Sequence, residues 1–79
     1  MSMFRFGIAG PGAIARRFAA GLGELADVTL AAVASHSKTR AEEFVREHQS
    51  LFPKLIAYDS YEKMADASLV DAVYISNLN

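Results

Sequence analysis

Three small residues recur at fixed spacing in the segment GPGAIA, residues 10–15, which reads G-x-G-x-x-A. Each position has a separate role in the fingerprint of a dinucleotide-binding turn. Gly10 permits a tight turn, Gly12 lets the backbone approach a pyrophosphate, and Ala15 lets a helix pack closely on a strand. The alternative is a tight turn that holds no ligand. The spacing favours the nucleotide site, because a plain turn rarely needs a small residue at all three positions.

The segment lies between an apolar run and a helical pattern, which is the context that such a site requires. Residues 4–9 read as a strand, and residues 13–22 have apolar side chains at helical spacing. The backbone N–H groups of Ala13 and Ile14 would then face phosphate oxygens at the helix start, where the dipole favours negative charge. Arg16 and Arg17 fall on the opposite, solvent-facing side, and we do not assign them to the phosphate.

A second polar group follows the second apolar run, VTLAAVAS, residues 28–35. It consists of Ser35, His36, Ser37, Lys38 and Arg40, and no acidic residue occurs until position 42. An NAD site usually has a carboxylate here for the ribose hydroxyls, whereas hydroxyls and cations suit a 2′-phosphate. The pattern therefore favours NADP over NAD as cofactor. The alternative is that Lys38 and Arg40 are ordinary solvated helix residues, with Arg40 paired to a nearby glutamate.

Strands and helices alternate along the whole chain. We expect strands at 4–9, 28–35, 55–58 and 70–76, and helices at 13–22, 38–49 and 60–67. Each crossover is too long for a hairpin, so the β-α-β-α-β-α-β order predicts a parallel sheet with helical connections. The fold class is therefore α/β and Rossmann-like.

Local signals place the helix ends and faces. The expected buried face of the first helix consists of Ile14, Phe18 and Leu22, with Ala15 and Ala19 beside them. Gly23 can end that helix in the left-handed conformation. Ser37 can cap the second helix. Asp59 with Glu62 has the spacing of a capping box for the third.

Composition narrows the class of protein. The chain has 79 residues, 52% of them hydrophobic, a formal net charge of -1 and no cysteine. Disulfides and thiolate metal sites are excluded, and we expect no metal site, because His36 and His48 fall on separate segments. The charge gives no pull toward nucleic acid, and no apolar run reaches the roughly 20 residues that a membrane helix needs. We expect a cytoplasmic protein that binds neither nucleic acid nor a membrane.

Together these motifs resemble the N-terminal part of the Gfo/Idh/MocA oxidoreductases, and within that group the dihydrodiol dehydrogenase-like branch. The matching segments, in order, are FGIAGPGAIARRF, LAAVASHSKTRAEEF, AYDSYEKM and VDAVYISNLN. They span nearly the whole chain. Four motifs in the right order are more specific than the glycines alone.

The resemblance implies cofactor contacts in three places: the pyrophosphate at Gly10, Gly12, Ala13 and Ile14; the adenosine ribose and its 2′-phosphate at Ser35, His36 and Ser37; the nicotinamide half at Asn77 and Asn79. His36 stands where the family usually has arginine. A neutral imidazole holds a phosphate less firmly, because it lacks the planar fork of a guanidinium.

Residues 1–79 then form the truncated N-terminal half of a dinucleotide-binding domain. The family's catalytic Glu-Lys-Pro motif and its histidine lie further along the chain, so we assign no catalytic residue here. The full-length parent is expected to be a homo-oligomer that transfers a hydride between nicotinamide and a sugar, polyol or related alcohol. The 79 residues alone are expected to be inactive.

Two other functions use similar folds. One is a non-catalytic nucleotide-sensing or interaction module, which fold alone does not exclude. The other is a methyltransferase, whose second strand generally ends in an acid, whereas this strand ends in Ser35 and His36.

Overall fold

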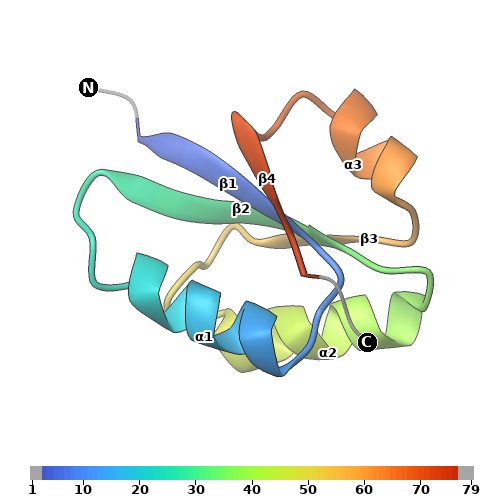
Figure 1. The fold of residues 1–79 in the computed structure, drawn as a ribbon, viewed down its shortest axis with the longest axis horizontal. Helices are drawn as coiled ribbons and strands as arrows, with labels where there is room; N and C mark the ends of the chain where they lie inside the picture. Colours follow the sequence, from blue (N-terminus) through green and yellow to red (C-terminus); the bar gives the residue numbers. More distant parts are fainter. Residues whose placement is uncertain (1–2, 77–79) are drawn as a thin grey trace.

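The computed structural model describes residues 3–76, in which four strands alternate with three helices (Figure 1). The elements are β1 (Phe4–Ala9), α1 (Ala13–Leu22), β2 (Val28–Ala34), α2 (Lys38–His48), β3 (Ile56–Tyr58), α3 (Tyr61–Asp66) and β4 (Ala72–Ile75). The expected β-α-β-α-β-α-β order is confirmed. The bounds of β1 and α1 agree with the sequence prediction, and the others are shorter by one to three residues.

The strands form one parallel sheet in the order β3-β2-β1-β4. The chain builds outward from β1 to β3 and then returns to pair β4 with the other side of β1. This is the order of a Rossmann-like fold, and its direction changes between β1 and β4. In such sheets ligands bind at that change of direction, outside the carboxyl ends of the strands.

The helices cover the two faces of the sheet unequally. α1 and α2 lie together against one face, and the short α3 lies against the other (Figure 1). The larger core cluster includes Ile8, Leu30, Val33 and Phe44, all at most 1% exposed. A smaller cluster beneath α3 is built around Met64 with two alanines of β2. The result is a three-layer arrangement whose α3 side is only partly covered.

Two predictions for α1 are wrong. Ile14 is 49% exposed, whereas Ala15, Ala19 and Leu22 are buried. The two small alanines let the helix approach the sheet closely, so the buried stripe centres on them and Ile14 turns to the rim. Gly23 has φ −62°, a right-handed conformation, and its N–H donates to the Ala19 carbonyl at 3.1 Å. The helix end is therefore satisfied by ordinary turn bonds, without a left-handed cap.

The capping box expected at Asp59 and Glu62 is also wrong, by one residue. Ser60 is the N-cap of α3, and its hydroxyl accepts a hydrogen bond from the Lys63 N–H at 3.1 Å. The Asp59 carboxylate instead pairs with the Lys63 ammonium at 3.0 Å, which lowers the pKa of Asp59. Ser37 caps α2 as expected, accepting from the Arg40 N–H at 3.3 Å.

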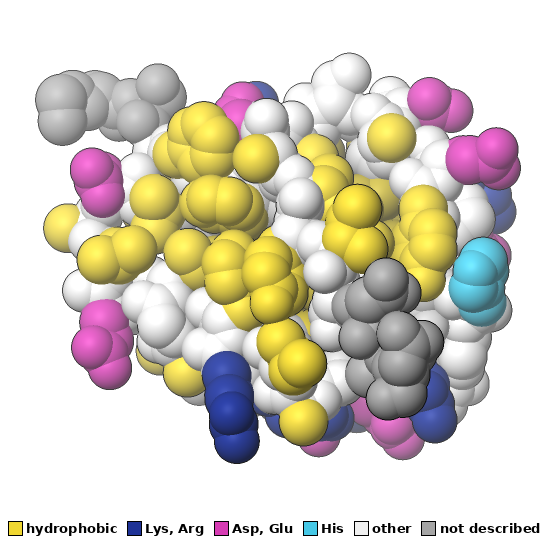
Figure 2. Space-filling model, in the orientation of Figure 1, with side chains coloured by type: hydrophobic (Ala, Val, Ile, Leu, Met, Phe, Trp, Pro, Cys, Tyr) yellow, Lys and Arg dark blue, Asp and Glu magenta, His cyan; other side chains and the backbone are white. Residues whose placement is uncertain are grey.

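The outer edge of β4 has no partner strand within residues 3–76. Val73 and Ile75 of this strand are 41% and 70% exposed. Figure 2 shows hydrophobic side chains gathered across the middle of the view, where Figure 1 places β4. None of the helices in the described residues is long and apolar enough to cross a membrane.

Candidate functional site

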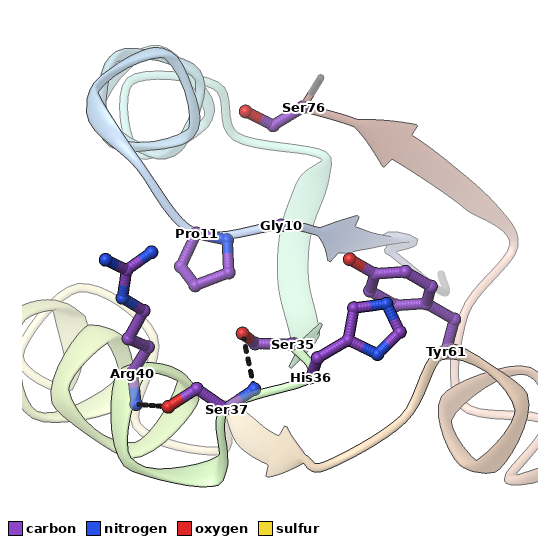
Figure 3. A pocket seen from close by; sticks show the side chains of 8 residues that line it. All are labelled: Gly10, Pro11, Ser35, His36, Ser37, Arg40, Tyr61 and Ser76. Atoms are coloured by element: carbon purple, nitrogen blue, oxygen red, sulfur yellow. Dashed lines mark hydrogen bonds between the residues drawn. The ribbon is translucent and has the colours of Figure 1, made fainter. Parts of the chain in front are cut away.

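The carboxyl ends of β1, β2 and β4 surround a pocket with a volume of about 360 Å³ (Figure 3). Its lining residues are Gly10, Pro11, Ser35, His36, Ser37, Arg40, Tyr61 and Ser76. They come from the ends of three strands and the starts of two helices. The pocket therefore lies where this sheet order places a ligand.

Gly10 makes the turn from β1 into α1. Its φ is +97°, a conformation that side chains strongly disfavour, and a Cβ at this position would lie 2.7 Å from the Ser76 carbonyl oxygen. The backbone also leaves no room at this point because Ser76 N donates to the Ala9 carbonyl at 2.9 Å. Glycine is therefore required here by both the backbone angle and the contact with β4.

Gly12 is the N-cap of α1, and here the backbone angle does not require glycine. Its φ of −178° and ψ of −168° are extended values that any residue adopts. No side chain caps this helix, and no acidic residue lies in its first turn. The first intrahelical bond runs from Arg16 N to the Gly12 carbonyl at 2.9 Å, so the amides before it, including those of Ala13 and Ile14, have no helical acceptor. Free N–H groups at a helix start favour an anion.

Ser35 and Ser37 form a linked pair at the end of β2. The Ser35 hydroxyl accepts from the Ser37 N–H at 3.1 Å, and the Ser37 hydroxyl accepts from the Arg40 N–H at 3.3 Å (Figure 3). In each case the hydroxyl oxygen is the acceptor, so its own proton stays available to donate. These two side chains are therefore held in place while each keeps a donor for an oxygen-rich ligand.

Arg40 lies on the boundary of two hollows. It lines the main pocket and a smaller neighbour of about 250 Å³, which Gly12, Arg16 and Glu43 also line. The side-chain ion pairs within residues 3–76 are Arg5–Asp71, Arg16–Glu47 and Lys63–Asp59. Arg40 is in none of them, so the alternative in which it pairs with a glutamate is not what the structure shows.

Arg16 is held away from the main pocket. Its guanidinium donates to the Glu47 carboxylate of α2 at 2.8 Å. This hydrogen bond lowers the pKa of Glu47 and raises that of Arg16, so both groups are charged at neutral pH. The interaction links α1 to α2 on their exposed sides, in agreement with the solvent-facing position predicted for Arg16.

The structure places the predicted site residues unequally. It brings Gly10, Ser35, His36, Ser37 and Arg40 together around one pocket, and Gly12 around the adjoining hollow. Ala13 and Ile14 begin α1 beside them, whereas Lys38, the first residue of α2, lines neither hollow. Asn77 and Asn79 lie outside the described residues.

Three lining residues were missed by sequence reasoning: Pro11, Tyr61 and Ser76. The ring centroid of Tyr61 lies 4.9 Å from that of His36. Tyr61 reaches the site because α3 starts next to the end of β2. Ser76 follows β4 as Ser35 follows β2, and it reaches the site because β4 pairs with β1.

Comparison with known proteins identifies the family. The family model described as an oxidoreductase family with an NAD-binding Rossmann fold, GFO_IDH_MocA, matches residues 4–79. The chain belongs to the Gfo/Idh/MocA oxidoreductase family. The expected resemblance to this family is therefore confirmed.

One curated Gfo/Idh/MocA relative is scyllo-inositol 2-dehydrogenase (NADP(+)) IolU of Bacillus subtilis (strain 168). It is 36% identical over 77 residues, which is 98% of this chain. The chain spans 22% of that relative's length. Family and relative together indicate an NAD(P)-binding domain of an oxidoreductase.

Proposed function

We propose that this chain is the nucleotide-binding part of an enzyme that transfers a hydride between a nicotinamide cofactor and a sugar, polyol or related alcohol. The observation that carries this proposal is the uncapped start of α1, with free amides beside a turn that only glycine can make. The name of the Bacillus relative, an inositol dehydrogenase, supports the class of substrate. When bound, the cofactor supplies the hydride chemistry. The residues of this chain hold and orient it.

We further propose that the cofactor is NADP in preference to NAD. The described side chains that line the main pocket include Arg40, His36 and three serine hydroxyls, and none of them is a carboxylate. A cation and hydroxyl donors stabilise a 2′-phosphate, whereas ribose hydroxyls are usually held by an acid. Lys38 adds positive charge at the start of the same helix, although it does not line the pocket. The relative named above is also an NADP enzyme by its name.

The catalytic groups of the enzyme are proposed to lie outside these 79 residues, in the part of the protein that completes the sheet and binds substrate. The exposed edge of β4 is where further strands would be added. On this proposal the isolated chain does not catalyse hydride transfer. The complete protein is proposed to be a cytoplasmic homo-oligomer.

Calorimetric titration of the complete protein with NADP⁺ and NAD⁺ tests both proposals. We expect Gly12→Val to abolish binding of both cofactors, because a side chain at this position blocks the approach of a pyrophosphate to the backbone. Arg40→Gln should weaken NADP⁺ by about tenfold and NAD⁺ by less than twofold, as for the loss of one charge-assisted contact. Equal or tighter binding of NAD⁺ by the unmodified protein would end the proposed NADP preference. Undiminished binding by Gly12→Val would contradict the proposed site.

A further inference from the structure

Ser76, directly after β4, carries a buried hydroxyl without a hydrogen-bond partner among the described residues. The residue is 6% exposed, and its Oγ is buried. The backbone of Ser76 is already satisfied in part, since its N–H donates to the Ala9 carbonyl at 2.9 Å. The side chain alone is therefore unpaired. A buried polar group in this state costs free energy, and native structures rarely keep one without a reason.

The position of Ser76 relates the unpaired hydroxyl to the cofactor pocket. Ser76 is one of the residues that line it, and Figure 3 shows the hydroxyl directed away from the strand. A Cβ built on Gly10 would lie 3.8 Å from the Ser76 Cβ, so this side chain adjoins the first residue of the glycine turn. Ser76 and the start of α1 therefore both adjoin the glycine turn, at the change of direction between β1 and β4.

We propose that the Ser76 hydroxyl donates a hydrogen bond to an oxygen of the bound dinucleotide, in the diphosphate or in the adenosine ribose. This inference rests on the proposed function, because it requires that the pocket hold a nucleotide. Binding gives the hydroxyl its missing partner, so the ligand-free protein contains a polar group prepared for the complex. Ser76 is then a positioning residue that links β4 to the cofactor.

This role gives Ser76→Ala an unusual pair of effects in the complete protein. Removing a hydroxyl that has no partner leaves the melting temperature of the ligand-free protein unchanged or higher. The same change weakens binding of ADP, the probe, by about tenfold, which corresponds to ~1.4 kcal/mol. Ser76→Cys, nearly the same size with a weak donor, should lose a similar factor and guards against a folding artefact.

Two serine variants serve as matched controls. Ser35→Ala removes a hydroxyl that accepts from the Ser37 N–H, so it should lower both affinity and melting temperature. Ser50→Ala, at an exposed position after α2, should change neither. Titration with adenosine then locates the contact: a loss with ADP alone assigns it to the diphosphate, and an equal loss with adenosine assigns it to the ribose.

The outcomes separate this inference from the function on which it rests. Unchanged ADP affinity in Ser76→Ala overturns the inference, and a lower melting temperature with unchanged affinity shows that the hydroxyl has a partner within the protein. Failure of the unmodified protein to bind ADP, NADP⁺ or NAD⁺ overturns the proposed function as well. A tenfold loss with an unaltered melting temperature supports both.

Discussion

Replacement of Gly10 by alanine tests the turn that shapes the site. The backbone at this residue has φ +97°, and a Cβ there would lie 2.7 Å from the Ser76 carbonyl oxygen, closer than real Cβ atoms approach. Strain of this kind costs about 1–3 kcal/mol. The contact adds to the strain, because relieving it moves the end of β4 and weakens the 2.9 Å bond from Ser76 N to the Ala9 carbonyl. We expect a total loss of about 2–4 kcal/mol in the free energy of unfolding.

A loss of this size is large for a chain of 79 residues. Domains of this length have a free energy of unfolding of roughly 4–12 kcal/mol, and each 1 kcal/mol shifts the melting temperature by about 4–8 °C. Gly10→Ala should therefore lower the melting temperature by about 10 °C or more, measured by circular dichroism. Urea unfolding should likewise give a lower free energy of unfolding for Gly10→Ala than for the unmodified chain.

Gly21→Ala is the matched control, because the same substitution meets the opposite environment. Gly21 lies within α1, and a Cβ there would meet no heavy atom within 4 Å apart from its chain neighbours and the backbone of its own helix. Alanine should stabilise this helix by about 0.5 kcal/mol. If Gly10→Ala unfolds at the same temperature as the unmodified chain, while Gly21→Ala behaves as expected, then the turn at Gly10 is not the strained turn that the structure shows.

Hydrogen bonds from the Arg5 guanidinium and N–H lower the pKa of Asp71, so the stability that this pair contributes is present above the ordinary carboxyl pKa range and is lost as pH falls through that range. Asp71→Asn should therefore flatten the pH dependence of the melting temperature below about pH 4. An unaltered slope would exclude the pair as the source of that pH dependence. Ser37→Ala and Ser60→Ala each remove a helix cap, and each should lower the free energy of unfolding in urea by about 1 kcal/mol. Only Ser37→Ala should also weaken NADP⁺ binding in the complete protein, because Ser37 lines the pocket. Equal effects of the two variants on binding would contradict the placement of the site. Ile75→Lys should reduce concentration-dependent association of the 79-residue chain in sedimentation experiments, because it places a charge on the exposed edge of β4. Unchanged association would exclude this edge as the surface through which the chain associates.

Element bounds were predictable from the sequence where a residue type, such as glycine between two apolar patterns, fits only one structural role. The bounds of β1 and α1 were correct because the glycines between them interrupt both patterns. Ser37 was correctly placed as a cap, whereas at the start of α3 two adjacent residues, Asp59 and Ser60, can both cap a helix, and spacing did not decide between them. The buried face of α1 was only partly predicted, because the close packing of Ala15 and Ala19 on the sheet leaves Ile14 exposed.

The site was only partly predictable, because strand order brings its remaining members together. Ser35 was found at the end of β2, next to the glycine turn in any parallel arrangement. Ser76 could be assigned to the site only once β4 was known to pair with β1. Tyr61 could be assigned only once α3 was known to start beside the end of β2. The unpaired state of the Ser76 hydroxyl depends on packing, which sequence patterns do not specify.

We attribute binding of the dinucleotide's diphosphate to the free amides at the start of α1. Amide chemical shifts, recorded by nuclear magnetic resonance during titration of the complete protein with ADP, test it most directly. We expect the largest changes at the N–H groups of Gly12, Ala13 and Ile14, and adenosine should leave these three nearly unchanged. Saturable ADP binding with its largest shifts elsewhere, or no binding at all, would exclude these amides as the diphosphate site.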